Sequence, residues 1–156
     1  MRSGIVILFL FLGWTVQAQF SPGDLSEAHK HLEGMSNCAS CHEAGNKVPD
    51  PKCLDCHREV QSLINQDRGY HSSDEVQTKT CVECHSEHHG RGFNSVRVDE
   101  DAFDHSLTGY ELEGEHGRID CRECHQPSFI TDEEIAKRSG TYLGLETVCL
   151  ACHEDQ

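Results

Sequence analysis

The chain has 156 residues, enough for one domain, and its 27 acidic residues against 13 Lys and Arg give a formal net charge of −14. A surface this negative disfavours nucleic acid and anionic membranes as partners. It suits a partner with a basic docking patch, although the same charge could serve solubility alone. Large apolar side chains are sparse after the first 20 residues, so the chain is poorly equipped to build an ordinary hydrophobic core.

Residues 1–18 are expected to be a signal peptide. Arg2 gives the positive start, an apolar run follows, and Val-Gln-Ala at 16–18 suits cleavage before Gln19. The alternative is an uncleaved membrane anchor, but the apolar run is shorter than the roughly 20 residues that a spanning helix needs. We therefore expect an exported protein, periplasmic or extracellular, whose residues 19–156 form a single domain.

Five Cys-x-x-Cys-His motifs account for all ten cysteines, which leaves none for disulfides. Each motif is typical of covalent haem c attachment: the two thiols add to the vinyl groups of one haem, and the His binds its iron. A zinc ribbon or a redox dithiol would explain the Cys pairs but not the His after every pair. The predicted covalent haem sites are Cys38, Cys41, Cys53, Cys56, Cys81, Cys84, Cys121, Cys124, Cys149 and Cys152, and the predicted proximal iron ligands are His42, His57, His85, His125 and His153.

The spacing of the motifs suggests two parts. The longest gap, 40 residues before Cys121, would divide a three-haem part, up to about residue 98, from a two-haem part after it. Neither part is expected to have its own core without shared haems, so we expect one pentahaem domain and not two. The five haems would supply the missing apolar bulk, and the haem-free chain is expected not to fold.

The fold is expected to be mostly irregular, with short α-helices and little or no β structure, organised around five covalently bound haems. Short helices are predicted at residues 25–32 with Asp24 or Ser26 as N-cap, at 53–64, after a capping box at 131–134 that ends before Gly140, and from about residue 146. Pro49 and Pro51 are expected in loops, and residues 93–98 could form a short extended segment.

The sixth iron ligand decides between electron transfer and catalysis, because a side chain in that position leaves no open site for a substrate. Seven His lie outside the motifs, whereas Met35 is the only Met after residue 18. Five distal ligands are needed, so this supply favours five bis-His haems. His29 and His31 are two apart on a predicted helix and point in different directions. His88 and His89 are adjacent, so one member of each pair is expected to bind iron.

Phe103-Asp-His105, followed by Gly114-Glu-His116 and the fourth motif, resembles the bis-His pattern of the class III multihaem cytochromes, which are small trihaem and tetrahaem periplasmic electron carriers. The third motif with His88 and Gly90 is similar to the same group. The resemblance spans residues 25–153, and the five motifs depart from the three or four haems of the small members. It implies low potentials, closely packed haems and a preference for His29 over His31. The predicted distal ligands are His29, His71, His88, His105 and His116.

These inferences predict an electron-transfer protein, not an enzyme, that passes electrons along five low-potential haems to redox protein partners. One alternative is a haem subunit of a larger respiratory or filamentous assembly, which would include a homo-oligomer or association with a membrane complex. A distal His taken from a neighbouring chain would make such an assembly obligatory. The other alternative, a multihaem reductase, is disfavoured because all five motifs are regular and the His supply forces no vacancy.

Overall fold

The structure, a computed structural model, describes residues 23–45 and 47–154. The predicted signal peptide, residues 1–18, lies outside the described residues. Within the part of the chain that is described, no helix is long and apolar enough to cross a membrane.

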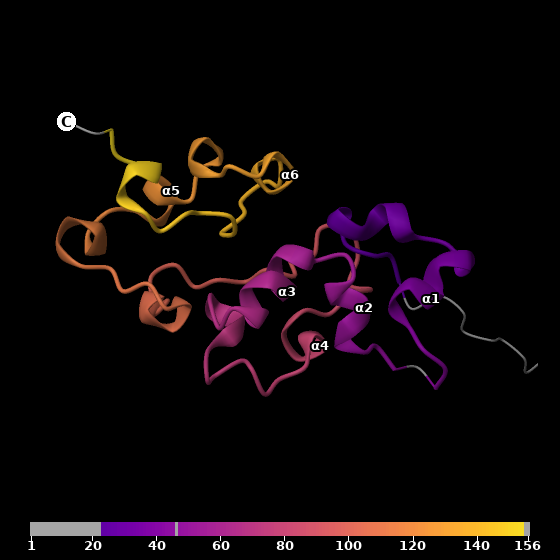
Figure 1. The fold of residues 1–156 in the computed structure, drawn as a ribbon. Helices are drawn as coiled ribbons and strands as arrows, with labels where there is room; N and C mark the ends of the chain where they lie inside the picture. The colour runs from indigo at the N-terminus through magenta and orange to yellow at the C-terminus, as the bar shows by residue number, and fades with distance from the viewer. Residues whose placement is uncertain (1–22, 46, 155–156) are drawn as a thin grey trace, which may run out of the picture.

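Short helical turns separated by irregular chain make up the fold (Figure 1). The described residues up to 98, the three-motif region, contain η1 (Glu27–Leu32), η2 (Met35–Asn37), α1 (Cys38–Cys41), α2 (Asp50–Leu54), α3 (Arg58–Asn65), η3 (Tyr70–Ser72) and α4 (Cys81–Cys84). Residues 99–154, the two-motif region, contain η4 (His105–Thr108), η5 (Gly114–Gly117), α5 (Cys121–Cys124), η6 (Pro127–Phe129), α6 (Glu133–Ala136) and η7 (Cys149–Ala151).

Strands are absent from the described residues, where the only β-type pairs are two isolated bridges, Glu43–Lys47 and Ile130–Leu145. The prediction of a mostly irregular fold with short helices is therefore confirmed. The segment at 93–98 makes no such bridge and is irregular.

The helix predicted at residues 53–64 is wrong as a single element. The chain forms α2 and α3 instead, and His57 between them takes φ −89° and ψ 60°, which is not helical. Pro51 lies within the first turn of α2 and not in a loop, because a proline at the start of a helix loses no hydrogen bond. The break turns His57 out of the helical path.

The other predicted helices form, but they start later than expected. The first is a 3₁₀ helix, η1, that begins at Glu27 after Ser26. In α6 the N-cap is Asp132 and not Thr131, because the Asp132 carboxylate accepts the backbone N–H groups of Glu134 and Ile135. The last turn begins at Cys149, three residues after the predicted start.

Very few side chains are buried in the described residues. Ile130 and Ile135, at 7% and 8% exposed, are the buried apolar residues, and both belong to the two-motif region. Among its described residues, the three-motif region buries only Ser26, a polar residue that is 3% exposed. A chain of this size without a larger apolar core depends on something other than its own side chains for cohesion.

Two distant segments lie side by side in the three-motif region. The amide of Gly90 donates to the carbonyl of Asp24 at 3.0 Å, and Glu27 donates to Arg91 at 3.2 Å. The Arg91 guanidinium donates to the Leu25 carbonyl at 3.0 Å and also forms an ion pair with Glu33. The start of the described chain is therefore fastened to the segment that follows the third motif.

The two regions meet at η3 and η4, and Figure 1 shows α1–α4 gathered apart from α5 and α6. The amide of Gly69 donates to the carbonyl of Thr108 at 3.0 Å, and the rings of Tyr70 and Phe103 lie edge to face with centroids 5.3 Å apart. A second link is the ion pair between Glu59 of α3 and Arg138 after α6.

Candidate haem sites

Each of the five motif histidines lies ring to ring with a different histidine from outside the motifs. The ring centroids of every pair are between 5.9 and 6.2 Å apart. The pairs are His29 with His57, His42 with His88, His71 with His85, His105 with His125, and His116 with His153.

This separation fits a metal ion held between two imidazoles. Two metal–nitrogen bonds of about 2 Å, end to end, place the ring centres roughly 6 Å apart. Aromatic rings in direct contact span centroid distances of about 4.5–7 Å, so what distinguishes these pairs is that one separation recurs at all five motif histidines. The histidines present therefore fit a haem iron between each pair, bound from both faces.

The pairs differ in the angle between their ring planes. Three pairs are nearer to parallel, at 28° for His42 and His88, 29° for His71 and His85, and 40° for His105 and His125. Two pairs are crossed, and these are His29 with His57 at 74° and His116 with His153 at 76°. Each region thus contains one crossed pair.

Three of these imidazoles are oriented by backbone carbonyls. The Nδ1 atom of His85 lies 2.8 Å from the Ser95 carbonyl, and that of His105 lies 2.7 Å from the carbonyl of Tyr110. The His88 Nδ1 atom lies 3.0 Å from the carbonyl oxygen of Gly23. A carbonyl only accepts hydrogen bonds, so Nδ1 carries the hydrogen and Nε2 keeps a free lone pair for a metal.

His29 is oriented by a carboxylate instead. Its Nδ1 atom lies 2.6 Å from Oε1 of Glu87, and Glu87 also accepts from the amide of Ser26 at 2.7 Å and from its hydroxyl at 2.8 Å. The paired residue His57 has its Nδ1 atom 3.5 Å from Oε1 of Glu59. Sequence reasoning missed Glu87, because nothing in its position among 27 acidic residues distinguishes it.

Two other motif histidines lack this kind of support. The Nδ1 atoms of His42 and His125 are buried and have no hydrogen-bond partner. Burial, followed by the neighbouring His105 and Arg122, lowers the pKa of His125. Burial and the neighbouring His85 likewise lower the pKa of His71. The lowered pKa values favour the neutral form of His71 and His125, which is the form that a metal ion binds.

The two histidines left over lie outside these pairs. His31 is exposed on η1, and His29 of the same turn is the one that faces a motif histidine. His89 is also exposed, with its ring against Phe93 at 4.4 Å and its Nε2 atom 2.9 Å from the Ser86 hydroxyl. The structure thus brings His29 and His88, and not their neighbours, to motif histidines.

The cysteines of the second and third motifs are close to each other. The backbone amide of Cys81 donates to the carboxylate of Asp50 at 2.9 Å, at the start of the helix that carries Cys53. Burial, Asp50 and the neighbouring Cys53 thiol raise the pKa of Cys81 to about 12. All ten cysteines are free of disulfides.

An aromatic and charged cluster surrounds the fourth motif. The ring of Tyr142 lies edge to face against His125 at 5.2 Å, and the Arg122 guanidinium stacks 4.1 Å over Tyr142. Glu100 accepts from the Tyr142 hydroxyl and pairs with Arg122 at 3.0 Å. These contacts hold the Tyr142 ring against His125.

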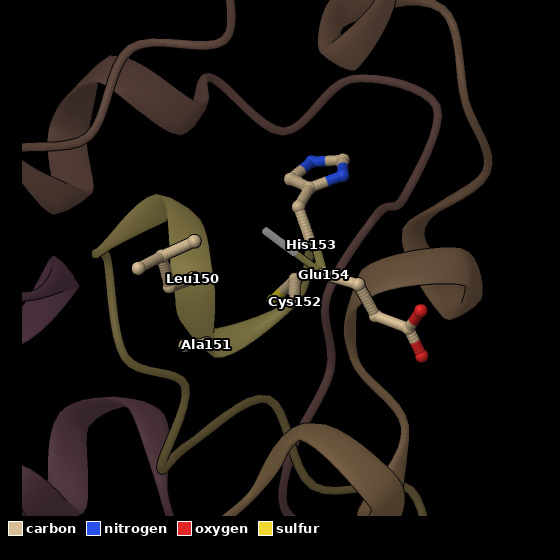
Figure 2. A pocket seen from close by; sticks show the side chains of 5 residues that line it. All are labelled: Leu150, Ala151, Cys152, His153 and Glu154. Atoms are coloured by element: carbon tan, nitrogen blue, oxygen red, sulfur yellow. The ribbon is translucent and has the colours of Figure 1, made fainter. Parts of the chain in front are cut away.

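The fifth motif borders an open surface pocket of about 400 Å³ lined by Leu150, Ala151, Cys152, His153 and Glu154. Figure 2 shows the His153 side chain projecting away from the turn that carries Leu150 and Ala151. Leu150 is 66% exposed and Val148 is 64% exposed, so this motif presents apolar side chains with no protein partner. A porphyrin face could cover them.

The ten histidines therefore form five pairs. The described residues contain no group of three or more His, Cys, Asp or Glu side chains arranged to hold a metal ion. The assignment of the ten motif cysteines and of the ten paired histidines to haem stays a prediction.

Comparison with known proteins gave one family match. Residues 26–98, just under half of the chain, match the family model described as Cytochrome c3. Nothing matches this chain among the curated proteins or the solved structures. The matched segment contains the first three motifs and the contacts of Glu87. The match supports a multihaem, class III-like c-type cytochrome, with covalently bound haem c and electron transfer as its function.

Proposed function

We propose that the chain is an exported electron-transfer protein that holds five haems c, each bound by two histidines. One observation carries the proposal: all five motif histidines face a second histidine of the same chain at 5.9–6.2 Å. When bound, the haems would supply one-electron iron couples of low potential, because bis-His ligation lacks the Met that raises potentials.

The paired histidines also support a carrier over an enzyme. A side chain on each face of an iron leaves no coordination site for a substrate. No motif histidine requires a ligand from elsewhere, which supports a chain that does not take a distal His from a neighbour. A multihaem reductase would need at least one motif histidine whose opposite side is open.

Contacts between motifs support a continuous route for electrons. The thiols of Cys53 and Cys81 are neighbours. Cys124 and Cys152 are also close, because burial and then the Cys152 thiol raise the pKa of Cys124. Tyr70 and Phe103 bridge the two regions. The Tyr70 ring centroid lies 6.2 Å from that of His71, and the Phe103 ring centroid lies 6.1 Å from that of His105.

The acidic composition supports a redox protein with a basic docking patch as the physiological partner. The same charge disfavours nucleic acid. Export to the periplasm or the cell exterior rests on the N-terminal sequence of residues 1–18.

Haem counting tests the proposal directly. We expect the pyridine haemochrome assay on purified protein to give five covalent haems per chain. The reduced protein should not bind carbon monoxide, and the oxidised protein should show only low-spin signals in electron paramagnetic resonance (EPR). Two or fewer haems would refute the proposal, and carbon monoxide binding with a high-spin signal would favour the reductase. Size-exclusion chromatography combined with haem per mass separates a monomeric carrier from an assembly.

A further inference from the structure

The segment from His85 to His88 contacts three of the five histidine pairs. His85 faces His71, and His88 faces His42. Between them, Glu87 contacts His29 of a third pair. The inference below rests on the proposed function, because it concerns what Glu87 does to the haem that His29 and His57 would hold.

The Glu87 carboxylate is held by three donors, two from Ser26 and one from His29. Ser26 is the most buried described residue that bears a polar side chain, at 3% exposed. The Glu87 side chain itself is only 22% exposed. The amide and the hydroxyl of Ser26 both donate to this carboxylate, so its oxygens act as acceptors and His29 is the donor in their contact.

No other pair has this arrangement. The partner ring of His57 faces a second carboxylate, Glu59, at 3.5 Å. The supports of His85, His88 and His105 are neutral backbone carbonyls. In the part of the chain that the structure describes, the carboxylate contacts of the paired rings are thus confined to His29 and His57.

We propose that Glu87 is a potential-setting residue that makes the haem of the second motif, held by His29 and His57, the lowest-potential haem of the five. A hydrogen bond from Nδ1 to a carboxylate draws the imidazole toward imidazolate and strengthens its donation to iron. Stronger donation favours ferric over ferrous iron, so the reduction potential falls. Glu87 acts through His29 and is a positioning residue.

The first test is a redox titration of the holoprotein carrying Glu87→Gln, followed by visible absorption. Glutamine keeps an acceptor oxygen but removes the charge. We expect the reduction potential of the lowest of the five components to rise by about 59 mV, which corresponds to a tenfold change in the equilibrium constant of a one-electron couple. The matched control is Glu27→Gln on η1, the helix that carries His29. The Glu27 carboxylate is 64% exposed and pairs with Lys30, so this variant should leave that component in place.

An unmoved lowest component in Glu87→Gln would overturn the proposal, as would an equal shift in Glu27→Gln. A second variant with the opposite expected sign keeps the test available if the first fails to fold. Ser26→Ala removes one donor from Glu87 and leaves more of the carboxylate charge to His29, so the same component should move downward. An upward move in Ser26→Ala would contradict the mechanism.

The wild-type protein provides an independent readout through the ring angles. Crossed imidazoles donate into different iron orbitals and give strongly anisotropic low-spin EPR signals, whereas near-parallel rings share one orbital and give rhombic signals. The His29–His57 pair is crossed at 74°. We expect the last ferric signal to disappear as the potential is lowered to be strongly anisotropic. A rhombic last signal would overturn the role of Glu87, while five low-spin haems would leave the proposed function intact.

Discussion

The three-motif region and the two-motif region compensate for few apolar side chains in different ways. In the three-motif region the buried residue is polar, and Ser26 joins Glu87 beside a candidate iron ligand. In the two-motif region the buried residues are apolar, and Ile130 and Ile135 both lie against Gly144. Burying each such side chain contributes roughly 1.5–3 kcal/mol. One region therefore depends on its haem sites for order, and the other has a small core of its own.

Removing one haem site from each region tests this comparison most strongly. In Cys81→Ala/Cys84→Ala the third motif loses its haem, and the segment that also positions His88 and Glu87 loses its anchor. We expect a loss of roughly 3–5 kcal/mol in stability, which lowers Tm by about 10 °C or more. The measurement is thermal melting followed by Soret circular dichroism, with haem content per mass.

The matched variant is Cys149→Ala/Cys152→Ala in the fifth motif. His153 contacts only His116 among the paired histidines, so loss of this haem should leave the other four sites in place. Its Tm should fall by less than half as much as in the first variant. Equal losses in the two variants would show that the regions do not differ in their dependence on haem.

The motifs made much of this site predictable, because Cys-x-x-Cys-His specifies haem chemistry through covalent spacing alone. Five regular motifs and few apolar residues also predicted an irregular fold with short helices, which is confirmed. The pairing of rings was beyond sequence reasoning. His88 follows the third motif by three residues yet faces His42 of the first, because long-range contacts such as that from His88 to Gly23 decide the pairing.

Local signals failed where side chains near the candidate sites override helix patterns. Residues 53–64 have helical periodicity, but the chain breaks at His57, whose ring faces His29. Glu87 escaped notice for a related reason. Its role depends on Ser26, which is 61 residues away in the sequence, so no local pattern identifies it.

Two glycines, Gly144 in the two-motif region and Gly23 in the three-motif region, allow the regions to be perturbed separately. A Cβ atom at Gly144 would lie 2.8 Å from Ile130 and 3.0 Å from Ile135, and φ there is +90°. Gly144→Ala should destabilise the two-motif region by roughly 1–3 kcal/mol through strain and overpacking, without changing the Soret spectrum. Gly140→Ala is the control, because φ is +69° but nothing lies within 4 Å, so it should cost about 1 kcal/mol.

The counterpart in the three-motif region is Gly23. A Cβ atom there would lie 2.6 Å from the carbonyl oxygen of His88, and φ is +113°. Because the Gly23 carbonyl also supports the His88 ring, Gly23→Ala should alter one low-spin EPR signal as well as stability. The comparison would fail if Gly144→Ala changed an EPR signal and Gly23→Ala did not.

The smallest expected effect concerns the ion pair that joins the regions, between Glu59 and Arg138. The Arg138 side chain is 41% exposed, so solvent screens the pair, and Arg138→Gln should cost only about 0.5–1 kcal/mol at neutral pH. Chemical denaturation of wild type and variant at several pH values measures the difference. Lys137→Gln is the control, because Lys137 pairs with Glu134 within one exposed turn and should change stability by less.

The pH dependence of that difference has a definite sign. Burial favours the protonated form of Glu59, but the hydrogen bond and charge of Arg138 prevail and lower the pKa of Glu59 below its ordinary 4.5. A lowered folded pKa adds stability that is present above pH 4.5 and is lost as pH falls through the folded value. Wild type and Arg138→Gln should therefore differ at neutral pH and converge in acid. A gap that persists unchanged in acid would mean that Arg138 joins the regions through packing of its side chain and not through the charge of Glu59.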